Sequence, residues 1–149
     1  MPSFNAAVGS MPAAAATIGF APLASPAPIK DAGNPYVEGS FSFTNSDTGY
    51  GATFREIGAR AGPFDLALVG IGAYTPRVIM ESSHATPEEA IAIARDIRAS
   101  RAVGMHWGSI MLTPEDPFEA PARFRQAALE QQYGEANAWI MQIGEVRSF

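Results

Sequence analysis

The chain of 149 residues has no cysteine and only two histidines. Without cysteine there is no disulfide and no thiolate ligand, so any metal site has to use histidine and carboxylate. No apolar run approaches the roughly 20 residues of a membrane-spanning helix. No charged residue precedes Lys30, so the basic start of a signal peptide is missing. We therefore expect a cytoplasmic protein without a transmembrane segment, or one peripheral to a membrane.

Positive charge is also scarce. Ten Lys and Arg residues stand against fifteen Asp and Glu, for a net charge of −5, which argues against nucleic acid as a partner. Several enzyme motifs are absent: there is no Gly-x-Ser-x-Gly elbow, no Walker A loop and no His-Glu-x-x-His. Residues 70–75 lack the third glycine of a dinucleotide-binding loop, and Pro76 stands where that loop needs a helix.

The first 35 residues differ in composition from the rest of the chain. They hold six of the twelve prolines and ten alanines, and their only charged residues are Lys30 and Asp31. Proline at this density removes backbone donors and interrupts regular elements. The sequence predicts a low-complexity Ala/Pro arm over residues 1–35 and one domain over residues 36–149.

Strand and helix patterns alternate after residue 36. The clearest helix signal begins at Thr86, where Pro87 takes the first helical position and Glu89 completes a capping box. Gly134 is expected to cap the last helix. The pattern predicts strands over 39–44, 64–71, 102–105 and 138–143, and helices over 53–61, 87–97 and about 121–133. This order is typical of an α/β domain whose ligand sites follow its strands.

Three residues with metal-binding side chains stand at element boundaries. Asp47 is interpreted as a metal ligand or as a plain Asx-turn residue. His106 follows a predicted strand and is interpreted either as a ligand that lines a pocket or as a core histidine bonded to a backbone carbonyl. His84 lies just before a helix N-terminus, which suits contact with a phosphate as well as simple exposure to solvent. Arg77 is a candidate anion contact, or an exposed surface arginine.

Together these segments resemble the metallo-β-lactamase superfamily, in particular its branch of N-acylphosphatidylethanolamine-hydrolysing phospholipases D and their bacterial relatives. The likeness covers roughly Val37 to Arg147. The matching stretches are residues 46–50, 62–67, 71–77, 84–90 and 105–108.

The resemblance implies an αββα sandwich made of two similar halves around one cleft, of which this chain is the C-terminal half. Asp47 would be the catalytic carboxylate that bridges two zinc ions, and His106 would bind the second zinc. His84 would take part in catalysis beside the substrate's phosphate or leaving group. Tyr74 and Arg77 would also contact the substrate.

The chain departs from the family pattern in its first half. The family carries a His-x-His-x-Asp-His loop there, and no histidine precedes His84 in this chain. Ser46 also stands where the family usually has glycine. We therefore expect a truncated zinc-dependent phosphodiesterase for N-acylphosphatidylethanolamine-like lipids, inactive alone, whose partner is a complementary first-half chain or another copy. The alternative is a non-enzymatic α/β module that binds a partner or an anion.

Overall fold

The computed structural model describes residues 42–45 and 47–149. The predicted arm over residues 1–35, its boundary with the domain at residue 36 and the start of the first predicted strand lie outside the described residues. The division of the chain into an arm and a domain therefore stays a prediction.

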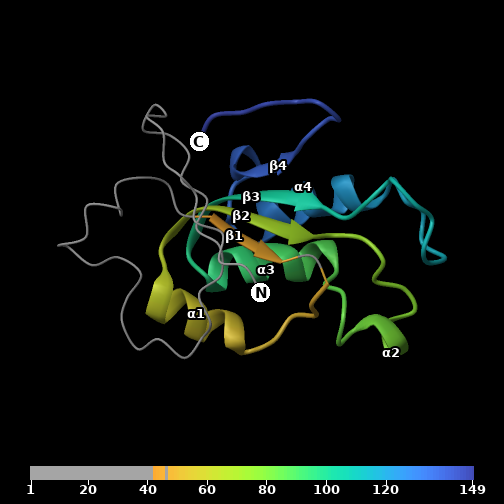
Figure 1. The fold of residues 1–149 in the computed structure, drawn as a ribbon, viewed down its shortest axis with the longest axis horizontal. Helices are drawn as coiled ribbons and strands as arrows, with labels where there is room; N and C mark the ends of the chain where they lie inside the picture. Colours follow the sequence, from red (N-terminus) through yellow and green to blue (C-terminus); the bar gives the residue numbers. More distant parts are fainter. Residues whose placement is uncertain (1–41, 46) are drawn as a thin grey trace, which may run out of the picture.

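A parallel four-stranded sheet organises the described chain (Figure 1). Its strands follow the order of the sequence: β1 (Ser42–Asn45), β2 (Phe64–Gly70), β3 (Ala99–Met105) and β4 (Ala138–Ile140). The helices between them are α1 (Thr53–Ala61), α2 (Arg77–Met80), α3 (Pro87–Asp96) and α4 (Ala120–Glu130), followed by a short 3-10 helix, Glu135–Asn137. Parallel neighbours need such crossover connections, and the predicted α/β class is confirmed.

Helix α3 forms where its local signals predict it. The Thr86 hydroxyl accepts a hydrogen bond from the Glu89 amide at 3.2 Å, and the Glu89 carboxylate accepts one from the Thr86 amide at 2.8 Å. This reciprocal pair satisfies two amides that a helix N-terminus otherwise leaves without partners. The apolar residues at helical spacing along α3 and at its C-cap are fully buried: Ala90, Ile93, Ala94 and Ile97.

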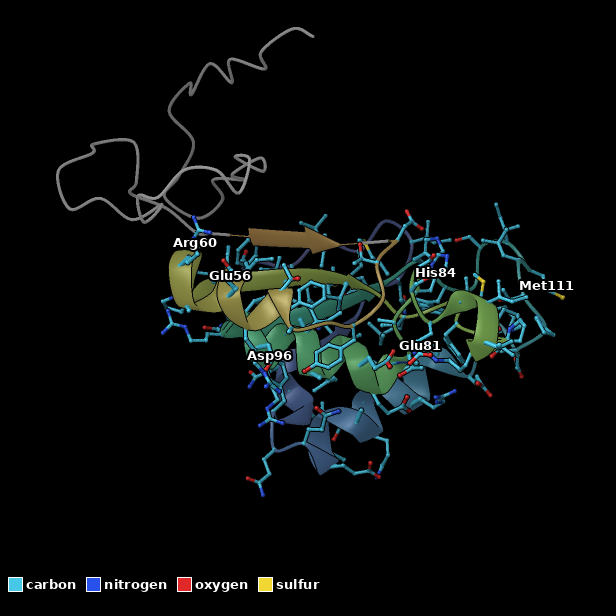
Figure 2. All side chains as sticks on the ribbon, turned by 90° about the horizontal axis from the view of Figure 1, so that it is seen from below. Glu56, Arg60, Glu81, His84, Asp96 and Met111 are labelled. Carbon is cyan, nitrogen blue, oxygen red and sulfur yellow. The ribbon has the colours of Figure 1, made fainter. Side chains whose placement is uncertain are left out.

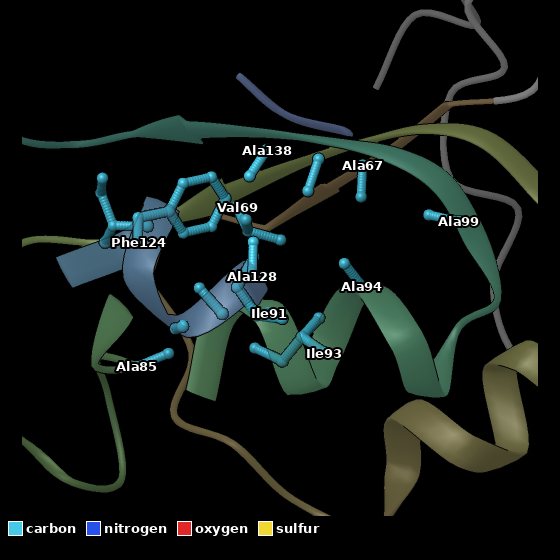
Figure 3. Packing of buried hydrophobic residues seen from close by; sticks show 14 of the residues in the cluster. Ala67, Val69, Ala85, Ile91, Ile93, Ala94, Ala99, Phe124, Ala128 and Ala138 are labelled. Carbon is cyan, nitrogen blue, oxygen red and sulfur yellow. The ribbon is translucent and has the colours of Figure 1, made fainter. Parts of the chain in front are cut away.

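The hydrophobic core lies between the sheet and its helices (Figure 3). Strand β2 contributes Ala67 and Val69, and α4 contributes Phe124, the largest side chain that is completely buried. Helix α3 packs against both β2 and β3, while α4 packs against α3 and β4. Figure 2 shows the helices together beneath the sheet.

The opposite face of the sheet carries apolar side chains in register. Leu68 pairs with Val103 and Val103 pairs with Trp139, and all three are only partly buried. The guanidinium groups of Arg101 and Arg147 lie 5.5 and 5.3 Å from the centroid of the Trp139 ring. Among the described residues no helix covers this face, as expected of one half of an αββα sandwich.

Some local predictions need correction. The residue that takes a left-handed conformation after α4 is Gln132, with φ of 58°, and the Tyr133 amide behind it bonds to the Ala128 carbonyl at 2.9 Å. Gly134 follows this turn, and its amide bonds to the same Ala128 carbonyl at 3.0 Å, so it takes part in the cap that Gln132 begins. Helix α2 was not predicted because four residues are too few to show a helical period.

No helix among the described residues is both long and apolar enough to cross a membrane.

Candidate metal centre

The three candidate ligands meet at one edge of the sheet. Asp47 follows β1, His106 follows β3, and His84 lies on the loop between α2 and α3. The carboxyl ends of parallel strands share an edge, which is where ligands bind in such sheets. The Asp47 Oδ1 atom lies 3.3 Å from His106 Nε2 and 3.9 Å from His84 Nδ1. The two imidazole rings lie 5.3 Å apart, so all three side chains form one cluster.

Two glycines allow the loops of this cluster to approach each other. The Gly49 amide donates to the Ser82 carbonyl at 3.2 Å, and a Cβ at Gly49 would lie 1.9 Å from the Glu81 carbonyl oxygen. A Cβ at Gly72 would lie 2.1 Å from the His106 carbonyl oxygen. Any side chain at either position would push a ligand-bearing loop away from its neighbour. The two glycines therefore set the spacing of the cluster.

His106 itself adopts a left-handed backbone conformation, with φ of 60°. This region is uncommon for residues other than glycine and costs about 1–2 kcal/mol. The Ile71 amide donates a hydrogen bond to the Met105 carbonyl at 3.0 Å, so the chain stays paired up to the residue before His106. Just after it, the Trp107 indole donates to the Gly104 carbonyl at 3.2 Å and closes the turn. The strained turn ends the strand and directs the imidazole toward Asp47, with 25% of the side chain exposed.

Arg77 holds the loop that carries His84. Its guanidinium donates to the His84 carbonyl at 2.8 Å and to both carboxylate oxygens of Glu89 at 2.8 and 3.1 Å. The His84 side chain is only 14% exposed, so it is not a solvent-exposed histidine. These contacts give Arg77 a positioning role through the capping box of α3. Its contact with a substrate stays a prediction.

The cluster can be compared with the geometry that zinc requires. Ligand distances of about 2.0–2.2 Å in a tetrahedral site separate neighbouring ligand atoms by roughly 3.3–3.6 Å. The 3.3 Å between Asp47 and His106 fits one edge of such a tetrahedron. His84 is more distant, although the three ligand atoms all lie within 4.8 Å of one another. Asp47 and His106 therefore fit a shared metal better than His84, whose imidazole lies beside them.

Tyr74 lies behind the cluster in a pocket that His106 and Trp107 also line. Burial raises the pKa of its hydroxyl, which donates a hydrogen bond to Glu119. The Tyr74 amide donates to Glu115 at 3.2 Å. Burial by itself would raise the pKa of Glu115, but this bond and one from a threonine hydroxyl lower it below its usual value. The substrate contact predicted for Tyr74 stays a prediction, because its hydroxyl is already engaged.

Glu115 and Glu119 are the residues that the sequence does not identify. The run from Thr113 to Asp116 looks like the start of a helix, yet the structure forms none there. The Thr113 hydroxyl instead bonds to Glu115 at 2.6 Å. The role of Glu115 and Glu119 depends on contacts with Tyr74, about 40 positions away, which no local pattern reveals.

Comparison with known proteins decides the family. The sequence model of the family described as "Beta-lactamase superfamily domain" matches residues 20–107, more than half of the chain. The chain belongs to the metallo-β-lactamase superfamily. The resemblance seen in the sequence is confirmed, and the superfamily is one of metal-dependent hydrolases.

Individual relatives agree with this assignment. N-acyl-phosphatidylethanolamine-hydrolyzing phospholipase D 1 of Caenorhabditis elegans is 47% identical over 64 residues, which are 42% of this chain and 18% of that protein. An uncharacterized protein of Mycobacterium tuberculosis is 38% identical over 95 residues, 62% of this chain and 25% of that protein. The mitochondrial phospholipase of the same name in Saccharomyces cerevisiae is 35% identical over 85 residues, 56% of this chain and 17% of that protein. These matches span a quarter or less of each relative.

A solved structure shares the fold. The metallo hydrolase Igni18 of the archaeon Ignicoccus hospitalis superposes with a TM-score of 0.52 at 24% sequence identity. The match covers 72% of this chain and 40% of the archaeal chain. The likeness shows that the two chains share a fold over the matched region.

Proposed function

We propose that the chain is the C-terminal half of a zinc-dependent phosphodiesterase for N-acylphosphatidylethanolamine-like lipids. The observation that carries this proposal is the convergence of Asp47, His84 and His106 at the carboxyl edge of the sheet. Asp47 and both histidines of the chain come from three separate segments, and they meet in one cluster. The phospholipase names of two relatives supply the lipid substrate class.

Each of the three residues has a distinct task. Asp47 would be the carboxylate shared by two zinc ions, and its 65% exposed side chain supports this role. His106, whose Nε2 atom lies 3.3 Å from Asp47, would hold the second ion. Zinc, when bound, polarises the phosphodiester and lowers the pKa of water to about 7. His84 lies farther from Asp47, at 3.9 Å, and contacts the phosphate or the leaving group.

A complete site needs more ligands than the described residues supply. A catalytic zinc normally takes three protein ligands, and Asp47 with His106 supplies two for one ion. The only other histidine, His84, has a separate task in this proposal. The apolar sheet face around Leu68, Val103 and Trp139 supports docking of a complementary first-half chain or of a second copy.

Complementation tests the proposal. The chain is mixed with a separately expressed first-half domain that contains a His-x-His-x-Asp-His loop, and hydrolysis of N-acylphosphatidylethanolamine is followed with zinc present. We expect activity only in the mixture, and its loss in Asp47→Asn. The matched control Glu56→Gln, on exposed α1, should leave activity unchanged. Absence of activity in the mixture, or full activity of Asp47→Asn, would contradict the proposal.

The alternative function is a non-enzymatic module that binds a partner or an anion through the same edge. The short ligand set favours it, because this chain has only two histidines. Under this alternative, the chain binds inorganic phosphate or a partner equally well with zinc and with a chelator. Hydrolysis in the complementation assay would exclude it.

A further inference from the structure

The loop after His106 exposes large apolar side chains to solvent. Four of them, Ile110, Met111, Leu112 and Phe118, are exposed to 73%, 77%, 63% and 68%. Helix α2 adds Val78 and Ile79, exposed to 91% and 68%. We call these six residues the apolar rim. Large apolar side chains gathered in this way commonly mark a surface that contacts a protein, a membrane or a ligand.

Polar side chains of the same loop form hydrogen bonds that fix its conformation. The Thr113 hydroxyl donates to Glu115 at 2.6 Å, and the Tyr74 amide donates to the same carboxylate oxygen at 3.2 Å. The Phe118 amide donates to the Asp116 carboxylate at 2.9 Å. Thr113 and Glu115 are partly buried and hold the loop together, while Asp116 is exposed beside the apolar side chains. The apolar exposure is thus built into the folded loop.

The rim lies beside the candidate metal centre. Ile110, Met111 and Leu112 line the same pocket as His106. A Cβ at Gly108, two residues after His106, would lie 3.5 Å from the Phe118 ring. Figure 2 labels His84 and Met111 at the same end of the molecule. Whatever the rim contacts is therefore brought next to the cluster of ligands.

The charges near the rim limit its partner. No Lys or Arg occurs between His106 and Ala122, while Glu115, Asp116 and Glu119 do. The guanidinium of Arg77, the first residue of α2, is bound to Glu89. These charges give an anionic surface no electrostatic attraction to the rim. The complementary partner is an apolar interior beneath headgroups that carry no net charge.

We propose that the apolar rim inserts into the headgroup region of a zwitterionic lipid bilayer and places the metal centre against the phosphodiesters of that surface. This inference rests on the proposed function for the orientation of the site. Separate side chains that protrude from a loop and a short helix fit between lipids, and their burial there is favourable in proportion to the apolar area removed from water.

Sedimentation with phosphatidylcholine vesicles tests the proposal. The full chain is used with a chelator, so that binding is measured without zinc and without hydrolysis. We expect the wild type to sediment with the vesicles, and Met111→Ser with Leu112→Ser to lower the partition coefficient by at least about tenfold. The matched control replaces Ile143 and Val146, exposed to 107% and 91%, with serine and should bind like the wild type.

Several results would overturn the proposal. The proposal would be wrong if the wild-type chain stayed in the supernatant, or if the rim and control variants lost vesicle binding equally. It would also be wrong if binding appeared only when phosphatidylglycerol is added. A concentration-dependent dimer that the rim variant abolishes would show instead that the rim joins two copies. Vesicle binding without phosphodiesterase activity in the complementation assay would leave this inference standing while the proposed function fails, so the two can be distinguished.

Discussion

Replacement of Arg77 tests whether the loop of His84 is held in place from behind. The guanidinium donates three hydrogen bonds, one to the His84 carbonyl and two to Glu89, between 2.8 and 3.1 Å. Arg77→Met keeps much of the length of the side chain and removes all three. The Glu89 carboxylate keeps its bond from the Thr86 amide, so helix α3 should still begin at the same residue.

The size of the effect follows from these contacts. Hydrogen bonds to charged groups contribute about 1.5–3 kcal/mol each when buried. Arg77 and Glu89 are 33% and 28% exposed, so water replaces part of what is lost. We expect Arg77→Met to lower the free energy of unfolding by about 1–2 kcal/mol. In the proposed site His84 contacts the phosphate and holds no ion, so we expect zinc affinity to change little and activity in the complementation assay to fall.

Urea denaturation and the complementation assay of the same variant measure the two effects separately. Arg60→Met is the matched control, since Arg60 pairs with Glu56 on exposed α1 and its loss should cost at most about 0.5 kcal/mol. Arg77→Lys keeps the charge without the planar fork and should recover stability only in part. If Arg77→Met were as stable as the control and as active as the wild type in the complementation assay, the positioning role would be wrong.

Phe124→Ala should lower the free energy of unfolding by about 3–5 kcal/mol in urea, because a completely buried ring leaves a cavity; a loss below 1 kcal/mol would contradict this packing. Gly72→Ala should destabilise by about 1–3 kcal/mol and weaken zinc binding, because its Cβ has to displace the His106 carbonyl; unchanged zinc affinity would count against that contact. Burial by itself would raise the pKa of Glu88, but hydrogen bonds from Arg123 lower that pKa below 4.5. The stability that the ionised Glu88 adds is therefore present above pH 4.5 and is lost as the pH falls further. Melting temperatures of Glu88→Gln should accordingly fall less between pH 6 and 3 than those of the wild type.

Helix α3 illustrates what the sequence reveals well. Thr86, Pro87 and Glu89 are neighbours in the chain, and the bonds among them depend on little else. Its buried stripe follows from spacing alone. The α/β class follows in the same way, because alternating patterns of period two and period 3.6 need no knowledge of distant contacts.

The candidate site could be predicted only in outline. That Asp47, His84 and His106 follow or precede regular elements is visible in the chain, and the rule for parallel sheets brings strand ends to one edge. The left-handed backbone of His106 and the close approach at Gly72 depend on the packing of two strands and cannot be seen locally. Arg77 looks like a surface residue until the fold brings Glu89 to it.

Zinc binding by the isolated chain tests most directly whether Asp47 and His106 share a metal ion. The measurement is titration calorimetry of the chelator-treated chain with zinc, with Asp47→Asn and His106→Ala beside the wild type and Glu56→Gln as control. We expect one zinc per chain for the wild type and the control, and no binding above background for the two site variants. Absence of zinc binding by the wild type, or equal binding by all four proteins, would contradict the assignment of this cluster as a metal centre.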